Sequence, residues 1–211
     1  MKRNLYFFLA HIDDFEISCL GYLFKNWHNY DKINVFIAST WEPKKAIWLK
    51  NLEKIQSMIG TKINYKSLNY NQRQFNKYFD EIKDDFYKEV DFKIEFDIVT
   101  HDINDCHTDH VACNQIAMGI FKYATNFTSI YSPSSINFKP NSWISLTDTQ
   151  FKVKKECINM YNIENEQSYT KLGYYMENEN FYNIGKSYHM ENFANERHSY
   201  YETYRILKME V

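Results

Sequence analysis

The sequence lacks the features that mark membrane, secreted and nucleic-acid-binding proteins. Its 211 residues carry a net charge of −2, so there is no basic field to attract a nucleic acid. The apolar run Leu5–Ala10 is too short for a secretion signal and is followed by charged residues. Because no stretch approaches the length of a membrane span, we expect a cytoplasmic protein with no membrane span and no nucleic-acid partner.

Cysteine is scarce, and the pattern of a disulfide framework or a zinc ribbon is absent. The four cysteines are scattered without a Cys-x-x-Cys pair, which is typical of reduced, mostly buried thiols in the cytosol. The sequence also shows no internal repeat and no linker. Its length suits one sizeable α/β core, so we expect a single domain over residues 1–211. The oligomeric state stays open, a homo-oligomer included.

Strand-like and helix-like segments alternate along most of the chain. Apolar runs of strand length cover residues 4–10, 33–38, 63–68, 96–100, 129–131, 143–146 and 204–209, and helical patterns cover residues 16–29, 46–59, 74–90, 109–124 and 149–162. This alternation predicts a three-layer α/β/α fold with a Rossmann-like, mostly parallel sheet. Gly21 is expected to let the first helix pack closely, and Gly60 to end the second. Loops are predicted at residues 178–180 and 185–186.

A histidine and two carboxylates follow the first predicted strand. His11, Asp13 and Asp14 come where residues 4–10 end and a helical pattern begins. In an open α/β sheet, ligands bind beyond the carboxyl ends of the strands, which is where these side chains are expected. A histidine and a carboxylate suit a zinc-like ion, and a second carboxylate can serve as a base. The alternative is that the three residues only cap the helix.

A second polar cluster follows the strand at residues 96–100. His107 and His110 open the next helical pattern, and residues three apart share one face of a helical turn. Both clusters therefore lie at strand-to-helix turns on the same edge of the predicted sheet. Two histidines and one carboxylate can hold a metal ion and leave positions open for water and substrate. His101 ends the preceding strand, and we expect a structural role for it.

At these residues the sequence resembles the PIG-L/LmbE-like de-N-acetylase family. Residues 10–14, Ala-His-Ile-Asp-Asp, look like the first motif of the family, and residues 107–110, His-Thr-Asp-His, look like the second. Weaker similarity covers residues 133–141 and the tail at residues 201–205. The resemblance implies the LmbE-like fold and a zinc-dependent N-deacetylase. Its substrate would be a small N-acetylated amino sugar such as N-acetylglucosamine, or a sugar conjugate.

The resemblance also assigns roles to individual residues. It implies that His11, Asp14 and His110 are the metal ligands and that Asp13 is the general base. It implies that His107 stabilises the oxyanion, and a protonated His107 requires a carboxylate to hold up its pKa. Asp109, Asp102 and Asp105 are the candidates for that support, although Asp109 alone can also be a helix cap. The ligand set suits Zn²⁺, Fe²⁺ or another divalent transition metal.

The chain departs from the family pattern in places that concern the substrate. Ile12 replaces the usual proline, and residues 46–53 contain no securely placed counterpart of the arginine and glutamate that relatives carry there. Two other readings therefore stay open: a sugar- or metal-binding relative without catalysis, and an amidase acting on a thiol-sugar conjugate. Ser134, Ser135 and Asn141 either bind sugar hydroxyls or shape their loop.

Overall fold

The computed structural model describes residues 3–164 and 200–209, and strands and helices alternate through most of them. The strands are β1 (Arg3–His11), β2 (Lys32–Ser39), β3 (Ile63–Ser67), β4 (Glu95–His101), β5 (Asn126–Ile130), β6 (Ser142–Leu146) and β7 (Tyr200–Lys208). The α-helices are α1 (Asp14–Ser18), α2 (Leu20–Asn26), α3 (Glu42–Ile59), α4 (Phe79–Glu89), α5 (Thr108–Met118) and α6 (Asp148–Glu164), with 3-10 turns η1 (Trp27–Asn29) and η2 (Phe75–Lys77). The loops predicted at residues 178–180 and 185–186 lie outside the described residues.

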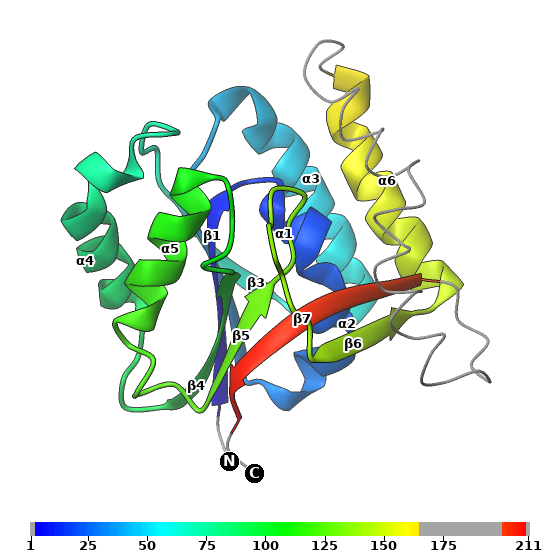
Figure 1. Ribbon diagram of the computed structural model, residues 1–211. Helices are drawn as coiled ribbons and strands as arrows, with labels where there is room; N and C mark the ends of the chain where they lie inside the picture. Colours follow the sequence, from blue (N-terminus) through cyan, green and yellow to red (C-terminus); the bar gives the residue numbers. More distant parts are fainter. Residues whose placement is uncertain (1–2, 165–199, 210–211) are drawn as a thin grey trace.

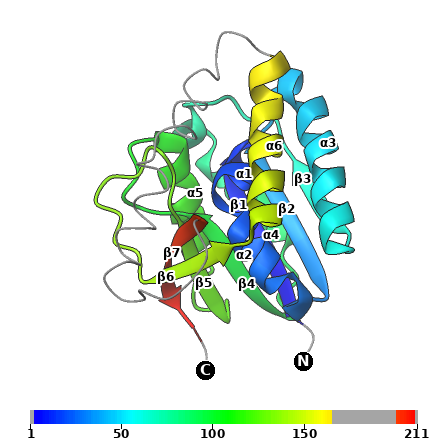
Figure 2. The same cartoon turned by 90° about the vertical axis from the view of Figure 1, so that its right-hand side faces the viewer.

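The described strands form one seven-stranded sheet in the order β3-β2-β1-β4-β5-β7-β6. The first five strands along the chain are parallel, whereas β7 runs antiparallel to both β5 and β6. Helices α4 and α5 cover one face of the sheet, and α1, α2, α3 and α6 cover the other (Figures 1 and 2). The predicted three-layer, mostly parallel α/β architecture is therefore confirmed, with two antiparallel strands at one side.

Strand β1 lies inside the sheet, between β2 and β4, and is buried on both faces. Leu5, Phe7 and Leu9 pack in the cluster under α1, α2 and α3, and the alternate residues of β1 pack in the cluster under α4 and α5. A central parallel strand needs apolar side chains on both faces, which explains the continuous apolar run. The run ends at His11, so the first polar side chain emerges at the carboxyl edge of the sheet.

The helix predicted over residues 16–29 is interrupted in the structure. It divides at Cys19, where φ is −122°, into α1 and α2, and a 3-10 turn follows. The interruption coincides with two hydrogen bonds from β7 to the start of α2. The Gly21 N–H donates to Glu202 Oε2 (2.8 Å), and the Tyr22 N–H donates to the Tyr204 hydroxyl (2.8 Å). Two otherwise unpaired donors of the first turn of α2 are thus satisfied by a strand about 180 residues away.

Gly21 is required for this close approach. A Cβ at residue 21 would lie 2.8 Å from Glu202 Oε2, and Glu202 cannot easily move because the buried Lys154 ammonium also binds it. We expect Gly21→Ala to lower the free energy of unfolding by about 1–3 kcal/mol, as overpacking does. Chemical denaturation measures the change, with the exposed Ser57→Ala on α3 as control. Equal stability of the two variants would contradict the tight contact.

Two other predicted helices are shorter than expected. The pattern over residues 109–124 gives a helix, α5, that ends at Met118. There the Tyr87 hydroxyl donates to the Ile116 carbonyl, and the backbone N–H groups of residues 119–121 bond to carbonyls three residues back instead of four. The pattern over residues 74–90 divides into η2 and α4 at Tyr78. Gly60 ends α3 in the left-handed conformation (φ 67°), as predicted. None of the described helices combines the length and the apolar character that crossing a membrane requires.

Candidate metal centre

Three side chains from two strand-to-helix turns converge at the carboxyl edge of the sheet. His11 ends β1, Asp14 begins α1, and His110 lies in the first turn of α5. His110 Nε2 is 3.3 Å from His11 Nδ1 and 3.4 Å from Asp14 Oδ1, and His11 Nδ1 is 3.5 Å from Asp14 Oδ2. All three residues are buried. The structure thus brings together the three residues that the sequence predicts as metal ligands.

The spacing of these atoms fits a small metal ion. A tetrahedral ion with bonds of about 2.0–2.1 Å places its ligand atoms about 3.3–3.4 Å apart. The separation of 3.3 Å between His11 Nδ1 and His110 Nε2 matches that edge length, and Asp14 approaches the two rings with different oxygens, Oδ1 at 3.4 Å from His110 and Oδ2 at 3.5 Å from His11. Two imidazoles and one carboxylate are also a donor set that divalent transition metals accept. The residues present therefore fit a divalent metal ion.

Carboxylates hold the second ring nitrogen of both histidines. Asp109 Oδ2 lies 3.2 Å from His11 Nε2, and Asp105 Oδ2 lies 2.9 Å from His110 Nδ1. Metal-binding histidines are commonly oriented in this way by an acceptor on the far nitrogen. Asp109 is fixed by the backbone N–H of Arg73 (2.6 Å), and Asp105 accepts the hydroxyl of Ser132. The N-cap residue of α5 is His107, and the Asp109 carboxylate instead meets His11 and the backbone of Arg73.

The electrostatics of the pair favour positive charge. Burial by itself would lower the pKa of His11, but hydrogen bonds to Asp109 and Asp14 raise it to about 9. Burial likewise opposes the charged form of His110, and the charge of Asp14 with the hydrogen bond to Asp105 raises its pKa to about 10. The surrounding carboxylates thus favour the charged form of each imidazole, while the charge of His110 acts against that of His11. The negative charge of these carboxylates equally suits a metal cation that takes the place of the protons on His11 and His110.

His101 lies directly beneath this centre. Its ring stacks on that of His110 with centroids 3.8 Å apart, and its Nε2 accepts the Ala10 N–H at 3.0 Å. Burial and the charge of His110 lower the pKa of His101 to about 4, so the imidazole is neutral. His101 Nε2 is also 3.3 Å from Asp14 Oδ2. Asp14, His101 and His110 also offer ligand atoms within 4.8 Å of one another, so His101 borders the centre, and its structural role stays a prediction.

His107 begins α5 beside the same centre, and each of His11, His107 and His110 offers a nitrogen within 4.8 Å of the others. His107 Nδ1 accepts the Asp109 N–H (3.3 Å), which leaves the proton of the neutral ring on Nε2. Burial and the positive charges of His11 and His110 lower the pKa of His107 to about 4. The carboxylates of Asp105 and Asp109 hold the neighbouring rings, so the arrangement favours a neutral His107 over the protonated form considered from the sequence.

Asp13 precedes α1 but does not cap it through its side chain. Its Oδ2 lies 4.0 Å from the Nζ of Lys44, in the first turn of α3. Burial and the adjacent charge of Asp14 raise the pKa of Asp13, whereas the charges of Lys44 and His11 oppose the rise. The Asp13 carboxylate thus lies near the expected ligands but is not one of them. The burial of Lys44 could not be recognised from the sequence, because a lysine in the polar first turn of a helix is usually exposed.

The loop after β5 supplies three serines next to the site. Ser134 Oγ lies 3.4 Å from His110 Nδ1 and 3.1 Å from Ser132 Oγ, and Ser135 Oγ accepts the Ser132 N–H at 3.0 Å. Asn141 is placed differently, because both polar atoms of its amide bond to the backbone of Ile206 on β7. The geometry therefore favours the loop-shaping alternative for Asn141 and leaves Ser134 at the edge of the centre.

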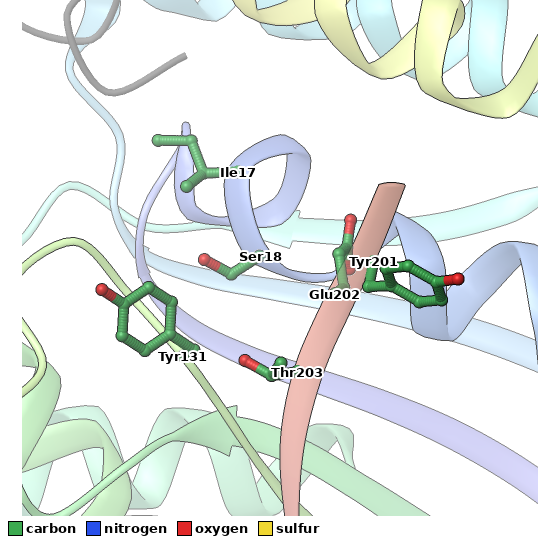
Figure 3. Close-up of a pocket in the computed structure, with 6 residues that line it drawn as sticks. All are labelled: Ile17, Ser18, Tyr131, Tyr201, Glu202 and Thr203. Carbon is green, nitrogen blue, oxygen red and sulfur yellow. The ribbon is translucent and has the colours of Figure 1, made fainter. Parts of the chain in front are cut away.

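A pocket opens beside α1, between that helix, the residue after β5 and the start of β7 (Figure 3). It contains about 280 Å³ of space that is partly open to solvent. The hydroxyls of Ser18, Tyr131 and Thr203 line it together with three further side chains, Ile17, Tyr201 and Glu202. Helix α1 contributes Asp14 to the candidate metal centre and Ile17 and Ser18 to this pocket.

Comparison with known proteins relates this fold to solved structures only. No protein-family model matches the sequence, and curated protein sequences give no significant match. N,N'-diacetylchitobiose deacetylase from Pyrococcus horikoshii is similar over 98% of this chain and 84% of its own, with 15% identity and a TM-score of 0.64. The zinc-inhibited form of teicoplanin deacetylase is similar over 97% of each chain, with 12% identity and a TM-score of 0.64.

A third similar structure is that of an enzyme named for a different reaction. The 4-carboxy-2-hydroxymuconate hydratase from Pseudomonas putida KT2440 is similar over 100% of this chain and 98% of its own, with 14% identity and a TM-score of 0.63. The fold of this chain is thus that of the LmbE/PIG-L-type deacetylases, as the sequence predicted. Since a hydratase shares it, the activity has to be argued from the residues of the site.

Proposed function

We propose that this protein is a metal-dependent hydrolase that removes the N-acetyl group from an N-acetylated amino sugar or sugar conjugate. The observation that carries the proposal is the convergence of His11, Asp14 and His110, with Asp13 beside them. The chitobiose and teicoplanin deacetylases of similar fold support a sugar-containing substrate. The four free cysteines suit a reducing compartment, in agreement with a cytoplasmic enzyme.

The residues divide into binding and proton-transfer roles. His11, Asp14 and His110 would hold the metal ion, and Asp109 and Asp105 orient the two imidazoles. A divalent ion bound there would supply a water molecule whose pKa is lowered to about 7 and would polarise the amide carbonyl. Asp13 takes the proton from the attacking water and returns it to the nitrogen of the leaving amine, which preserves the proton balance of hydrolysis.

His107 is the group that we assign to the developing oxyanion. Its Nδ1 accepts the Asp109 N–H, so a neutral ring carries its proton on Nε2. That N–H can donate to the negatively charged oxygen of the tetrahedral intermediate. This role does not require a protonated His107. Among the described residues no carboxylate bonds to its ring, which agrees with a neutral imidazole that donates from Nε2.

The test is hydrolysis of a panel of N-acetylated sugars by the protein loaded with one metal at a time. N-acetylglucosamine, its disaccharide and a thiol-sugar conjugate are incubated with the Zn²⁺, Fe²⁺ and Co²⁺ forms, and acetate and free amine are quantified. We expect equal amounts of both products from at least one sugar substrate. Metal comparison is needed because a similar teicoplanin deacetylase is described as zinc-inhibited. Full metal occupancy without any amine would favour the alternative of a binding protein that lacks catalysis.

The support given to His110 by Asp105 leads to a separate prediction. Asp105→Asn keeps the shape of the side chain but removes the charge that accepts from His110 Nδ1. Loss of such a partner typically lowers metal affinity about 10- to 100-fold. Competition with a chromogenic chelator measures the change, and the exposed Asp84→Asn on α4 is the control. Wild-type affinity in Asp105→Asn would mean that the imidazole is oriented by other contacts.

A further inference from the structure

Lys44 is a buried cation beside the proposed general base. Its side chain is 10% exposed, and its Nζ lies 4.0 Å from Asp13 Oδ2. The ammonium also lies 4.6 Å from the ring centre of Trp41, the residue that precedes α3. Strand β2 ends next to β1, with Ser39 opposite His11, so α3 begins at the edge that carries the candidate metal centre. Lys44 is therefore brought to Asp13 by the sheet order rather than by proximity in the sequence.

The burial of this ammonium requires compensation. A charged group taken out of water is destabilised unless an opposite charge or a polar group meets it. Burial does lower the pKa of Lys44, while the charges of Asp13 and Asp14 act in the opposite direction. The backbone N–H of Lys44 donates to the Trp41 carbonyl at 2.9 Å, so the residue belongs to the ordered start of the helix. The Asp13 carboxylate, 4.0 Å from Nζ, supplies the opposite charge.

Lys45, the next residue, has the ordinary environment of a lysine at the start of a helix. Lys45 is 37% exposed on its side chain and pairs with Glu42 of its own helix at 3.3 Å. Such an exposed pair contributes little to stability. Lys44 differs in its burial, in its aromatic neighbour and in a partner from another element, although both lysines occupy the first turns of α3. The difference indicates that the Lys44–Asp13 contact serves the site.

We propose that Lys44 is a positioning residue for Asp13. Its ammonium holds the carboxylate in the orientation in which Asp13 receives the proton of the attacking water. The inference rests on the proposed function, because it assigns Lys44 a role through the base of that reaction. The alternative is that Lys44 binds the substrate itself, which would affect KM rather than kcat.

The experiment compares Lys44→Met, Lys44→Arg and the matched control Lys45→Met in the metal-loaded full chain. We expect Lys44→Met to lower kcat roughly 10- to 100-fold, as a misplaced catalytic group does. Its KM should change by less than about twofold, and its metal content should stay at the wild-type value. Lys44→Arg should recover part of the lost kcat because it restores the charge, and Lys45→Met should match the wild type.

A double-mutant cycle of Lys44→Met and Asp13→Asn in thermal unfolding provides a readout independent of turnover. Coupled effects on stability are expected from a direct ion pair, and additive effects would overturn the contact. A rise in KM at unchanged kcat, or unchanged kinetics, in Lys44→Met would overturn the positioning role. If the wild type releases acetate from no substrate, the proposed function fails and the role of Lys44 in it fails too. If the double-mutant cycle then still shows coupled effects on stability, the Lys44–Asp13 contact stands and only the assigned reaction is wrong.

Discussion

Asp13→Asn is expected to lower kcat for acetate release by roughly 10²–10⁴-fold, the contribution of a positioned general base. The amide occupies the same space as the carboxylate but cannot accept a proton. Because the Asp13 side chain makes no capping hydrogen bond to α1, the fold should be retained. Metal content should also be retained, because His11, Asp14 and His110 remain in place. Steady-state kinetics together with elemental analysis of the purified variant measure both effects.

The control for this variant is Asp80→Asn, which replaces an exposed aspartate in the first turn of α4. It should have wild-type kcat and metal content. Two outcomes would contradict the assignment in different ways. Unchanged turnover in Asp13→Asn would remove Asp13 from proton transfer, whereas loss of the metal together with activity would make Asp13 a ligand.

His110→Ala is expected to abolish both metal binding and turnover. His110 Nε2 faces Asp14 Oδ1 and His11 Nδ1, so its removal deletes one corner of the three-residue centre. Only one imidazole and one carboxylate of the proposed set remain, and two ligands bind a divalent transition metal far more weakly than three. Equilibrium dialysis should find little metal retained, and acetate release should fall below detection in the same preparation.

The comparison for His110→Ala has to separate metal loss from unfolding. Removing the imidazole leaves Asp105 buried without its ring partner, so some loss of stability is also expected. Circular dichroism of the variant and of the wild type treated with chelator should therefore be measured side by side. The exposed His28→Ala should retain metal and activity. A folded His110→Ala protein with full metal content would exclude His110 from the centre.

The sequence predicted the fold well because its main signals are local. The continuous apolar run of β1 reflects burial on both faces, and the position of His11 directly after it fixes that residue at the carboxyl edge. Spacing within a turn is equally local, so His107 and His110 could be assigned to one helix start. The ligand roles required the resemblance to a family as well, because spacing alone does not distinguish Asp13 from Asp14.

Contacts between distant segments could not be predicted from the sequence. The division of the first predicted helix at Cys19 coincides with bonds to Glu202 and Tyr204, which reach the start of α2 from the far end of the chain. Nothing near Cys19 in the sequence indicates that its neighbours bond to β7. Asn141 was considered for substrate binding, and only the pairing with Ile206 shows a structural partner for its amide.

Hydrophobic periodicity and short motifs are properties of adjacent residues, so they already indicate which residues follow buried strands and can carry metal chemistry. The supporting contacts are visible only in the folded chain: the carboxylates of Asp109 and Asp105 on the two imidazoles, His101 stacked on His110, and Lys44 against Asp13. These contacts join different elements, and their formation depends on strand order and helix packing. A side chain's burial and charge partner therefore become known only when the chain is folded.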